Sequence, residues 1–104
     1  MGIAGGFTGV RAIAALAAAH GVFIQPHNCG GPISTAACLH LSFSIPNFLI
    51  QEMFPIWPED NRLELVDAPY ERQVVEGHAL LPTRPGLGVE LNDDYLRRCD
   101  QMDA

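Results

Sequence analysis

Two ionisable side chains, His27 and Glu52, each stand directly after a short apolar run of the chain. In α/β barrels, polar residues that follow buried strands in this way carry the chemistry. A histidine there could act as a general acid or base near neutral pH. A carboxylate could accept a hydrogen bond from a substrate hydroxyl, orient an acid or bind a cation. A structural histidine and an ion pair with a loop arginine are the alternatives, but the two residues together favour a site.

The first half of the sequence predicts the elements that would position these two residues. Residues 9–20 have helical periodicity, with Thr8 as a predicted N-cap and Gly21 ending the helix. Residues 22–25 and 48–51 are mostly apolar and read as strands, the first of them buried on both faces as in a parallel sheet, and a helix is predicted over 32–44 between them. This is the βαβ pattern of a parallel sheet, with His27 and Glu52 at the carboxyl ends of its strands.

The second half has a different character. A Pro-rich acidic loop, in which Trp57 either closes over a ligand or simply packs, precedes a predicted short strand at 62–66. Residues 71–81 predict a hairpin that turns at Glu76-Gly77. The segment 82–88 predicts an ordered loop. Asn92 or Asp93 could cap a last helix that runs through Arg98.

Other residues that could do chemistry have weaker support. His20, His40 and His78 are expected to be structural or exposed. A metal site built from His27, Cys29 and His40 has no recognised ligand spacing and is disfavoured. The cysteines (Cys29, Cys38 and Cys99) are an odd number without a C-x-x-C pair, so free thiols are expected.

Composition excludes several classes of function. The formal charge is −6, and all six basic residues are arginines. Nucleic acids and anionic membranes attract concentrated positive charge, so neither is expected as a partner. The apolar stretch at 12–19 is too short to span a membrane, and a cytoplasmic location is expected.

Three motifs in order resemble the end of enolase-superfamily enzymes of the mandelate racemase and muconate lactonising type, and most closely their acid-sugar dehydratases such as galactonate dehydratase. The motifs are Pro-His-Asn-Cys-Gly-Gly-Pro at 26–32, Ile-Pro-Asn-Phe-Leu-Ile-Gln-Glu at 45–52 and Arg-Pro-Gly-Leu-Gly-Val at 84–89. The resemblance covers essentially the whole chain.

The resemblance implies an α/β fold, the C-terminal part of a TIM-type (β/α)7β barrel. Residues 1–54 would be the end of the barrel, with its last two strands and their helices. Residues 55–104 would be a C-terminal extension that packs on the capping domain. His27 would be the seventh-strand general acid or base, Glu52 would contact the substrate or the developing enolate, and Asn28 would also bind substrate.

The resemblance further implies a dehydratase that uses Mg²⁺, removes a proton next to the carboxylate of an acid sugar and then releases water. The metal-binding acids and the aspartate that holds the histidine would fall before Met1, so no metal ligand is expected in this chain and the isolated chain is expected to be inactive. A complete barrel needs about 250 residues. A racemase or cycloisomerase of the same superfamily and a non-catalytic remnant that docks onto a full-length paralogue are the alternatives. The complete enzyme is expected to be a homo-oligomer.

Overall fold

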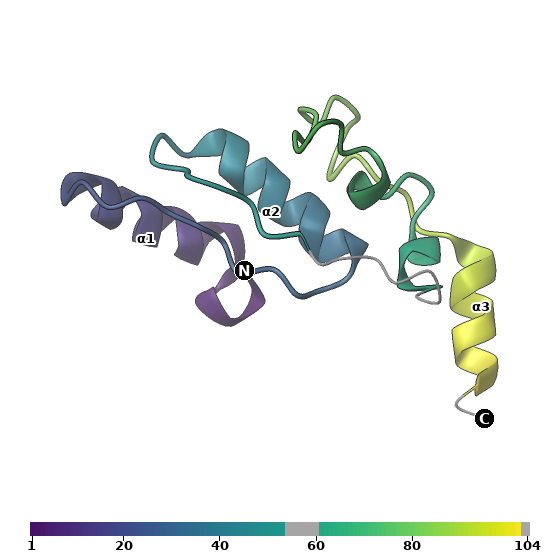
Figure 1. The fold of residues 1–104 in the computed structure, drawn as a ribbon. Helices are drawn as coiled ribbons and strands as arrows, with labels where there is room; N and C mark the ends of the chain where they lie inside the picture. The colour runs from purple at the N-terminus through teal and green to yellow at the C-terminus, as the bar shows by residue number, and fades with distance from the viewer. Residues whose placement is uncertain (54–60, 103–104) are drawn as a thin grey trace.

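The computed structural model describes residues 1–53 and 61–102, and within them the chain forms three α-helices and three short 3₁₀ helices. The α-helices are α1 (Gly6–Ala19), α2 (Pro32–Ser44) and α3 (Asp93–Met102), and the 3₁₀ helices are η1 (Gly2–Ala4), η2 (Asn61–Leu65) and η3 (Tyr70–Arg72). α1 and α2 lie side by side, and α3 projects from the opposite end of the molecule (Figure 1). The loops of the second half pack along the far side of α2.

Helix α1 begins earlier than the sequence predicted. Its N-cap is Gly5, whose φ of 81° is left-handed, and Thr8 lies inside the helix, so the predicted Thr8 cap is wrong. The C-terminal end is confirmed, because His20 is the C-cap and Gly21 follows with a φ of 67°. Glycine adopts this backbone conformation without the steric cost that a Cβ would bring.

The predicted strands at 22–25 and 48–51 meet in the parallel direction but do not form a ladder in the part of the chain described. They share one bridge, between Ile24 and Phe48. Its two hydrogen bonds run from the Ile24 N–H to the Asn47 carbonyl (2.7 Å) and from the Leu49 N–H to the Ile24 carbonyl (3.0 Å). A pair of strands without further neighbours is marginally stable, which explains why the predicted strands shrink to a single bridge.

Asn47 holds this bridge against α1. Its buried side-chain amide donates hydrogen bonds to the carbonyl of Ala14 (3.0 Å) and the carbonyl of Val22 (2.9 Å). Helix α1 and the two bridged segments are thereby fixed to one another, which sets the direction in which residues 25–28 leave the bridge.

The second half agrees with the prediction at the Glu76-Gly77 turn and differs from it in the strand at 62–66 and in the length of the hairpin. Residues 62–66 do not form the predicted strand, because Asn61–Leu65 is the 3₁₀ helix η2 and Val66 pairs with Leu91 in a single antiparallel bridge within the part of the chain that the structure describes. The Glu76-Gly77 turn is confirmed, with φ values of 50° and 78° that match a type I′ turn and with Val75 bridged to His78. The residues before the turn belong partly to η3, so the hairpin is shorter than predicted.

Helix α3 is capped by a side chain, as the sequence predicted. The Asn92 side-chain oxygen accepts hydrogen bonds from the N–H groups of Asp94 (3.1 Å) and Tyr95 (3.2 Å). These bonds satisfy donors that the first helical turn leaves free. The helix continues past Arg98 to Met102, beyond its predicted end.

The apolar core lies between α2 and the loops of the second half. Ala36, Leu39 and Tyr70 are buried together, with Met53, Ala79, Leu87 and Val89 packed partly buried around them. The Tyr70 hydroxyl donates a hydrogen bond to the Leu87 carbonyl (3.3 Å). Burial raises the pKa of the Tyr70 phenol, while the nearby positive charge of Arg84 lowers it by less.

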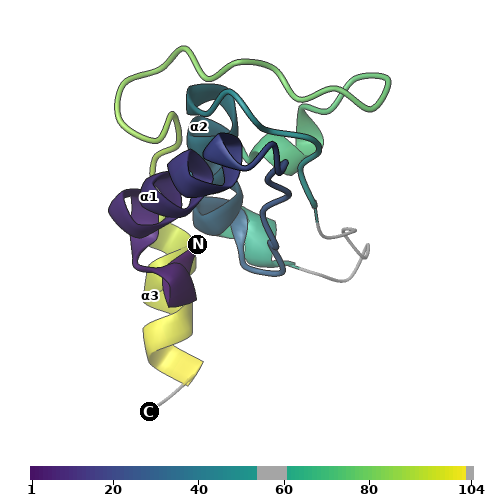
Figure 2. The same ribbon diagram turned by 90° about the vertical axis from the view of Figure 1, so that its left-hand side faces the viewer.

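The chain is open in shape and leaves much apolar surface uncovered. Its radius of gyration is 15.1 Å, whereas a compact domain of this length has about 13 Å. Large exposed hydrophobic side chains include Ile3 on η1 and Leu16 on α1. Phe23 and Leu49 on the bridged segments are exposed as well. Figure 2 shows the extended loop of the second half and the separate α3 from a second side. Among the described helices, none has the length and hydropathy that crossing a bilayer requires.

Gly88 allows the Tyr70 ring to pack, so Gly88→Ala is expected to destabilise the chain. Gly88 has a φ of 77°, and an added Cβ would lie 2.1 Å from the Tyr70 hydroxyl oxygen. We expect a loss of about 1–3 kcal/mol in the free energy of unfolding, measured by urea denaturation. Gly77→Ala is the control, because its φ is similar (78°) but its Cβ would meet nothing within 4 Å. Equal losses for the two variants would show that the contact with Tyr70 has no effect.

Asp67 is expected to make stability depend on acid pH. The Glu90 N–H and then the Arg84 side chain hold the pKa of Asp67 below its usual range. The ionised Asp67 therefore stabilises the fold above the unfolded-state pKa, about 3.9, and this contribution disappears as pH falls through the lower folded-state value. Urea midpoints between pH 7 and pH 2 should fall less for Asp67→Asn than for the unmodified chain. The exposed-carboxylate control, Glu76→Gln, should follow the unmodified chain; identical curves for all three would contradict the prediction.

Candidate functional site

The structure brings His27 and Glu52 into direct contact. The His27 Nδ1 atom lies 2.8 Å from the Glu52 Oε2 atom, and the two side chains are 77% and 41% exposed. His27 follows the Ile24 end of the parallel bridge and Glu52 follows the Phe48 end, so both leave the bridge in the same direction. The sequence-based expectation that these two residues lie side by side is met by the geometry.

Asn28 positions Glu52 from the other side. Its backbone N–H donates to the same Glu52 Oε2 atom (2.6 Å), so this oxygen accepts bonds from two neighbouring residues. The Asn28 side chain is buried, and its amide nitrogen donates to Thr35 Oγ1 (2.9 Å) and to the Glu52 carbonyl (3.4 Å). Its side-chain oxygen accepts from the Ser34 hydroxyl (2.8 Å). Asn28 therefore ties the loop to the first turn of α2, and its predicted contact with substrate stays a prediction.

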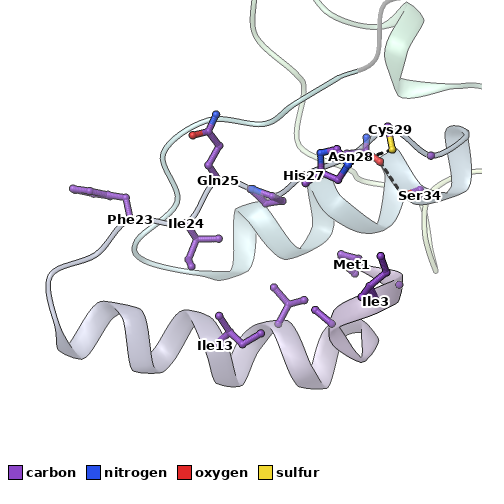
Figure 3. A pocket seen from close by; sticks show the side chains of 15 residues that line it. Met1, Ile3, Ile13, Phe23, Ile24, Gln25, His27, Asn28, Cys29 and Ser34 are labelled. Carbon is purple, nitrogen blue, oxygen red and sulfur yellow. Dashed lines mark hydrogen bonds between the residues drawn. The ribbon is translucent and has the colours of Figure 1, made fainter.

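The loop between His27 and α2 can take this path because residue 30 is a glycine. A Cβ on Gly30 would lie 2.6 Å from the Ser34 Cβ, so a larger residue would displace Ser34. Pro32 then starts α2 at a position where no N–H is needed. Figure 3 shows His27, Asn28 and Cys29 together at the end of this loop, close to Ser34.

The contact with Glu52 defines which nitrogen of His27 is available. When Nδ1 carries the proton that bonds the carboxylate, the neutral ring has its lone pair on Nε2. That nitrogen could accept a proton or, once protonated, donate one. The arrangement is a proton-transfer group with a carboxylate that fixes its orientation.

Two open hollows meet at His27. One, of about 440 Å³, is lined by Gln25, Pro26, His27, Ile50, Gln51 and Glu52. The other, of about 660 Å³, lies between α1 and residues 23–30 and is mainly apolar; Ile13 and Ile24 point toward each other across it (Figure 3). His27 and Gln25 thus line both hollows, and Gln51 and Glu52 line the first.

The other residues considered from sequence lie elsewhere. His40 is half-buried in α2, and His78 is exposed at the turn with Nδ1 2.9 Å from the Glu76 carbonyl. Residues 1–53 and 61–102 contain no group of three His, Cys, Asp or Glu side chains that could hold a metal ion. Trp57 lies outside the described residues.

Sequence reasoning missed one contact at the site. The Cys29 Sγ atom lies 3.3 Å from the His27 Nε2 atom. All three cysteines are free, and Cys29 is the exposed one, while Cys38 is buried and Cys99 is half-buried. The i, i+2 spacing of histidine and cysteine in a Gly-rich loop was the signal available, but it does not by itself bring two side chains together.

The elements and the site define an α/β protein with ionisable groups at the carboxyl ends of two parallel-paired segments. The model of the enolase C-terminal domain-like family matches residues 1–95. The chain therefore belongs to the enolase C-terminal domain-like family, which confirms the resemblance found in the sequence.

Relatives of known name and known structure agree with this assignment. The chain is 38% identical over 101 residues to D-galactonate dehydratase of Xanthomonas campestris pv. campestris (strain B100), covering 94% of this chain and 26% of the relative. A Salmonella enterica protein with a provisional dehydratase assignment superposes with a TM-score of 0.82 at 38% identity, covering 90% of this chain and 23% of that one. An enolase of the mandelate racemase subgroup from Agrobacterium tumefaciens gives 0.75 at 36% identity, covering 88% and 24%. The chain spans about a quarter of the length of these proteins.

Proposed function

We propose that this chain supplies the proton-transfer histidine of an acid-sugar dehydratase, with D-galactonate as the first substrate to test. The contact between His27 and Glu52 carries the proposal, because it gives a proton-transfer group a fixed orientation and leaves the proton exchange to Nε2, which lies 3.3 Å from the Cys29 Sγ atom. The similarity to D-galactonate dehydratases over 94% of the chain supports the choice of substrate class.

In this proposal His27 moves a proton at Nε2, and Glu52 keeps the ring in the tautomer that allows it. Dehydration next to a carboxylate requires a base that removes a carbon-bound proton and an acid that helps the hydroxide to leave. His27 can serve as either, depending on its protonation when substrate binds. The partly exposed Glu52 carboxylate would face substrate hydroxyls, and Asn28 would act by holding Glu52 in place.

The family resemblance brings Mg²⁺ into the proposal, but the described residues of this chain do not form a site that would hold the ion. Glu52 already uses Oε2 for His27 and Asn28, and no group of three possible ligands is present in the described ranges. A magnesium site needs several oxygen ligands in an octahedral arrangement. The ligands of such an ion would therefore have to come from residues other than these.

The proposal also explains why so many apolar side chains are exposed. We infer that residues 1–54 are the end of a (β/α)7β barrel and that 55–104 are the extension that packs on a capping domain. The parallel bridge between Ile24 and Phe48, with helices before and between its partners, supports the barrel assignment. The uncovered side chains of Phe23 and Leu49 would then be covered by the preceding barrel elements. A homo-oligomer is proposed for the complete enzyme on family grounds.

A grafting experiment tests the function. Residues 1–104 would replace the matching C-terminal quarter of the Xanthomonas campestris D-galactonate dehydratase, and formation of the 2-keto-3-deoxy acid from D-galactonate and related acid sugars would be followed. Activity with Mg²⁺ is expected, whereas the host enzyme without its C-terminal quarter should be inactive. A folded graft, by circular dichroism and gel filtration, that dehydrates no acid sugar would overturn the proposal.

The same graft separates the alternatives. A racemase or cycloisomerase would change the configuration or connectivity of the substrate without releasing the keto acid. A docking module, which the exposed apolar side chains also favour, would bind a full-length dehydratase as the separate 104-residue chain but would not restore a truncated one.

The separate 104-residue chain is expected to dehydrate no acid sugar, even with Mg²⁺ in excess. Its described residues carry the proton-transfer group but no site that fits the metal. The measurement is keto-acid formation by the purified chain, with the graft as positive control. Metal-dependent turnover by the chain alone would contradict this expectation.

A further inference from the structure

Cys29 contributes a thiol that the proposed dehydration does not use. Its Sγ atom lies 3.3 Å from the His27 Nε2 atom, while the opposite ring nitrogen lies 2.8 Å from Glu52. Thiol, imidazole and carboxylate thus stand in line, in the order that activates a nucleophile in hydrolases. Both Cys29 and His27 are exposed, so a small reagent can reach the sulfur (Figure 3).

We propose that Cys29 is a reactive thiol that soft electrophiles modify covalently, with His27 as the acceptor of its proton. The nucleophile in such reactions is the thiolate. When Nδ1 carries the proton that bonds Glu52, the Nε2 lone pair faces the thiol. The line of three groups therefore provides a base at hydrogen-bond distance and a carboxylate that stabilises the imidazolium.

Iodoacetamide is a suitable probe of this thiol. The thiol proton passes to Nε2, and the sulfur electron pair forms a bond to the methylene carbon. The carbon–iodine bond breaks, and iodide leaves with its electron pair. The imidazolium then releases the proton to water, which leaves Cys29 as a thioether and His27 neutral.

The other two thiols provide internal comparisons. Cys38 is buried in α2, and burial raises the pKa of its thiol, with smaller opposing effects from the N-terminal charge and from Ser34. Cys99 is half-buried on α3, at the other end of the molecule (Figure 1). Exposure alone would make Cys29 the most reactive of the three thiols. A test of the role of His27 therefore has to replace the imidazole while Cys29 stays exposed.

Modification would also affect the proposed dehydration. A group on the Cys29 sulfur would stand against Nε2 of His27, the nitrogen that the proposed reaction needs. This consequence rests on the proposed function, whereas the reactivity of the thiol does not, and the two are measured separately.

The first measurement is the alkylation rate of each cysteine in the 104-residue chain at pH 7, resolved by peptide mass spectrometry. Each native rate is divided by the rate of the same cysteine in denaturant. We expect Cys29 to have the highest ratio, and His27→Gln to lower it by about tenfold because the proton acceptor is lost. Glu52→Gln should lower it less, and the matched control His78→Gln should leave it unchanged. A Cys29 ratio unaffected by His27→Gln, or equal ratios for all three thiols, would overturn the proposal.

The second measurement uses the active graft. Alkylation should abolish its activity, and Cys29→Ser should remain active and resist the reagent. If Cys29 is alkylated fast but the graft stays active, modification does not block His27, although the thiol is still reactive. A graft that folds but is inactive before any treatment would count against the proposed function, and the alkylation rates would still decide whether Cys29 is reactive.

Discussion

His27→Gln is expected to reduce kcat of the grafted dehydratase by about 10²- to 10⁴-fold, the range for loss of a general acid or base. Glutamine approximates the size of the imidazole and can form hydrogen bonds, but it cannot exchange a proton near neutral pH. Because His27 is an exposed side chain at the site, the substitution should leave the fold intact. The measurement is keto-acid formation over a range of D-galactonate concentrations, which separates kcat from KM.

The control for this prediction is His78→Gln in the same graft. His78, like His27, is an exposed histidine. Its Nδ1 atom lies near the main-chain carbonyl of Glu76 rather than near a carboxylate, and it follows the Glu76-Gly77 turn. Its replacement should leave kcat within about twofold, since substitutions away from a site and on the surface have small effects. Equal rates for the two variants would mean that His27 does not transfer the proton.

Sequence patterns predicted that His27 and Glu52 lie together, but not the hydrogen bonds around them. The positions of His27 and Glu52 after two apolar runs were enough to expect them side by side, because parallel segments end at the same edge of a sheet. The engagement of Asn28 with Ser34 and Thr35 could not be predicted in this way. It depends on the side-chain directions in a loop whose path Gly30 makes possible, and no periodic pattern encodes that path.

The helices were predicted more accurately than the strands for a related reason. Helix α2 satisfies its backbone hydrogen bonds within one segment, so local signals such as Pro32 and Pro46 define its limits. A strand depends on partners elsewhere, and within the described residues the segments at 22–25 and 48–51 pair only with each other. Residues 62–66 were predicted as a strand, yet residues 61–65 form η2 with Leu63 buried, and Val66 is bridged to Leu91.

Leu39→Ala is expected to lower the free energy of unfolding by about 2–5 kcal/mol, the range for truncation of a buried leucine. Leu39 is only 2% exposed and packs with Ala36 and Tyr70, which connect α2 to η3. A chain with so open a shape has little stability to lose, because domains of ordinary compactness have about 5–15 kcal/mol. Leu16→Ala removes the same atoms from a side chain that is 66% exposed on α1 and should cost about 0.5 kcal/mol or less. Urea denaturation followed by circular dichroism compares them, and equal midpoints would show that the contact of α2 with η3 does not hold the chain together.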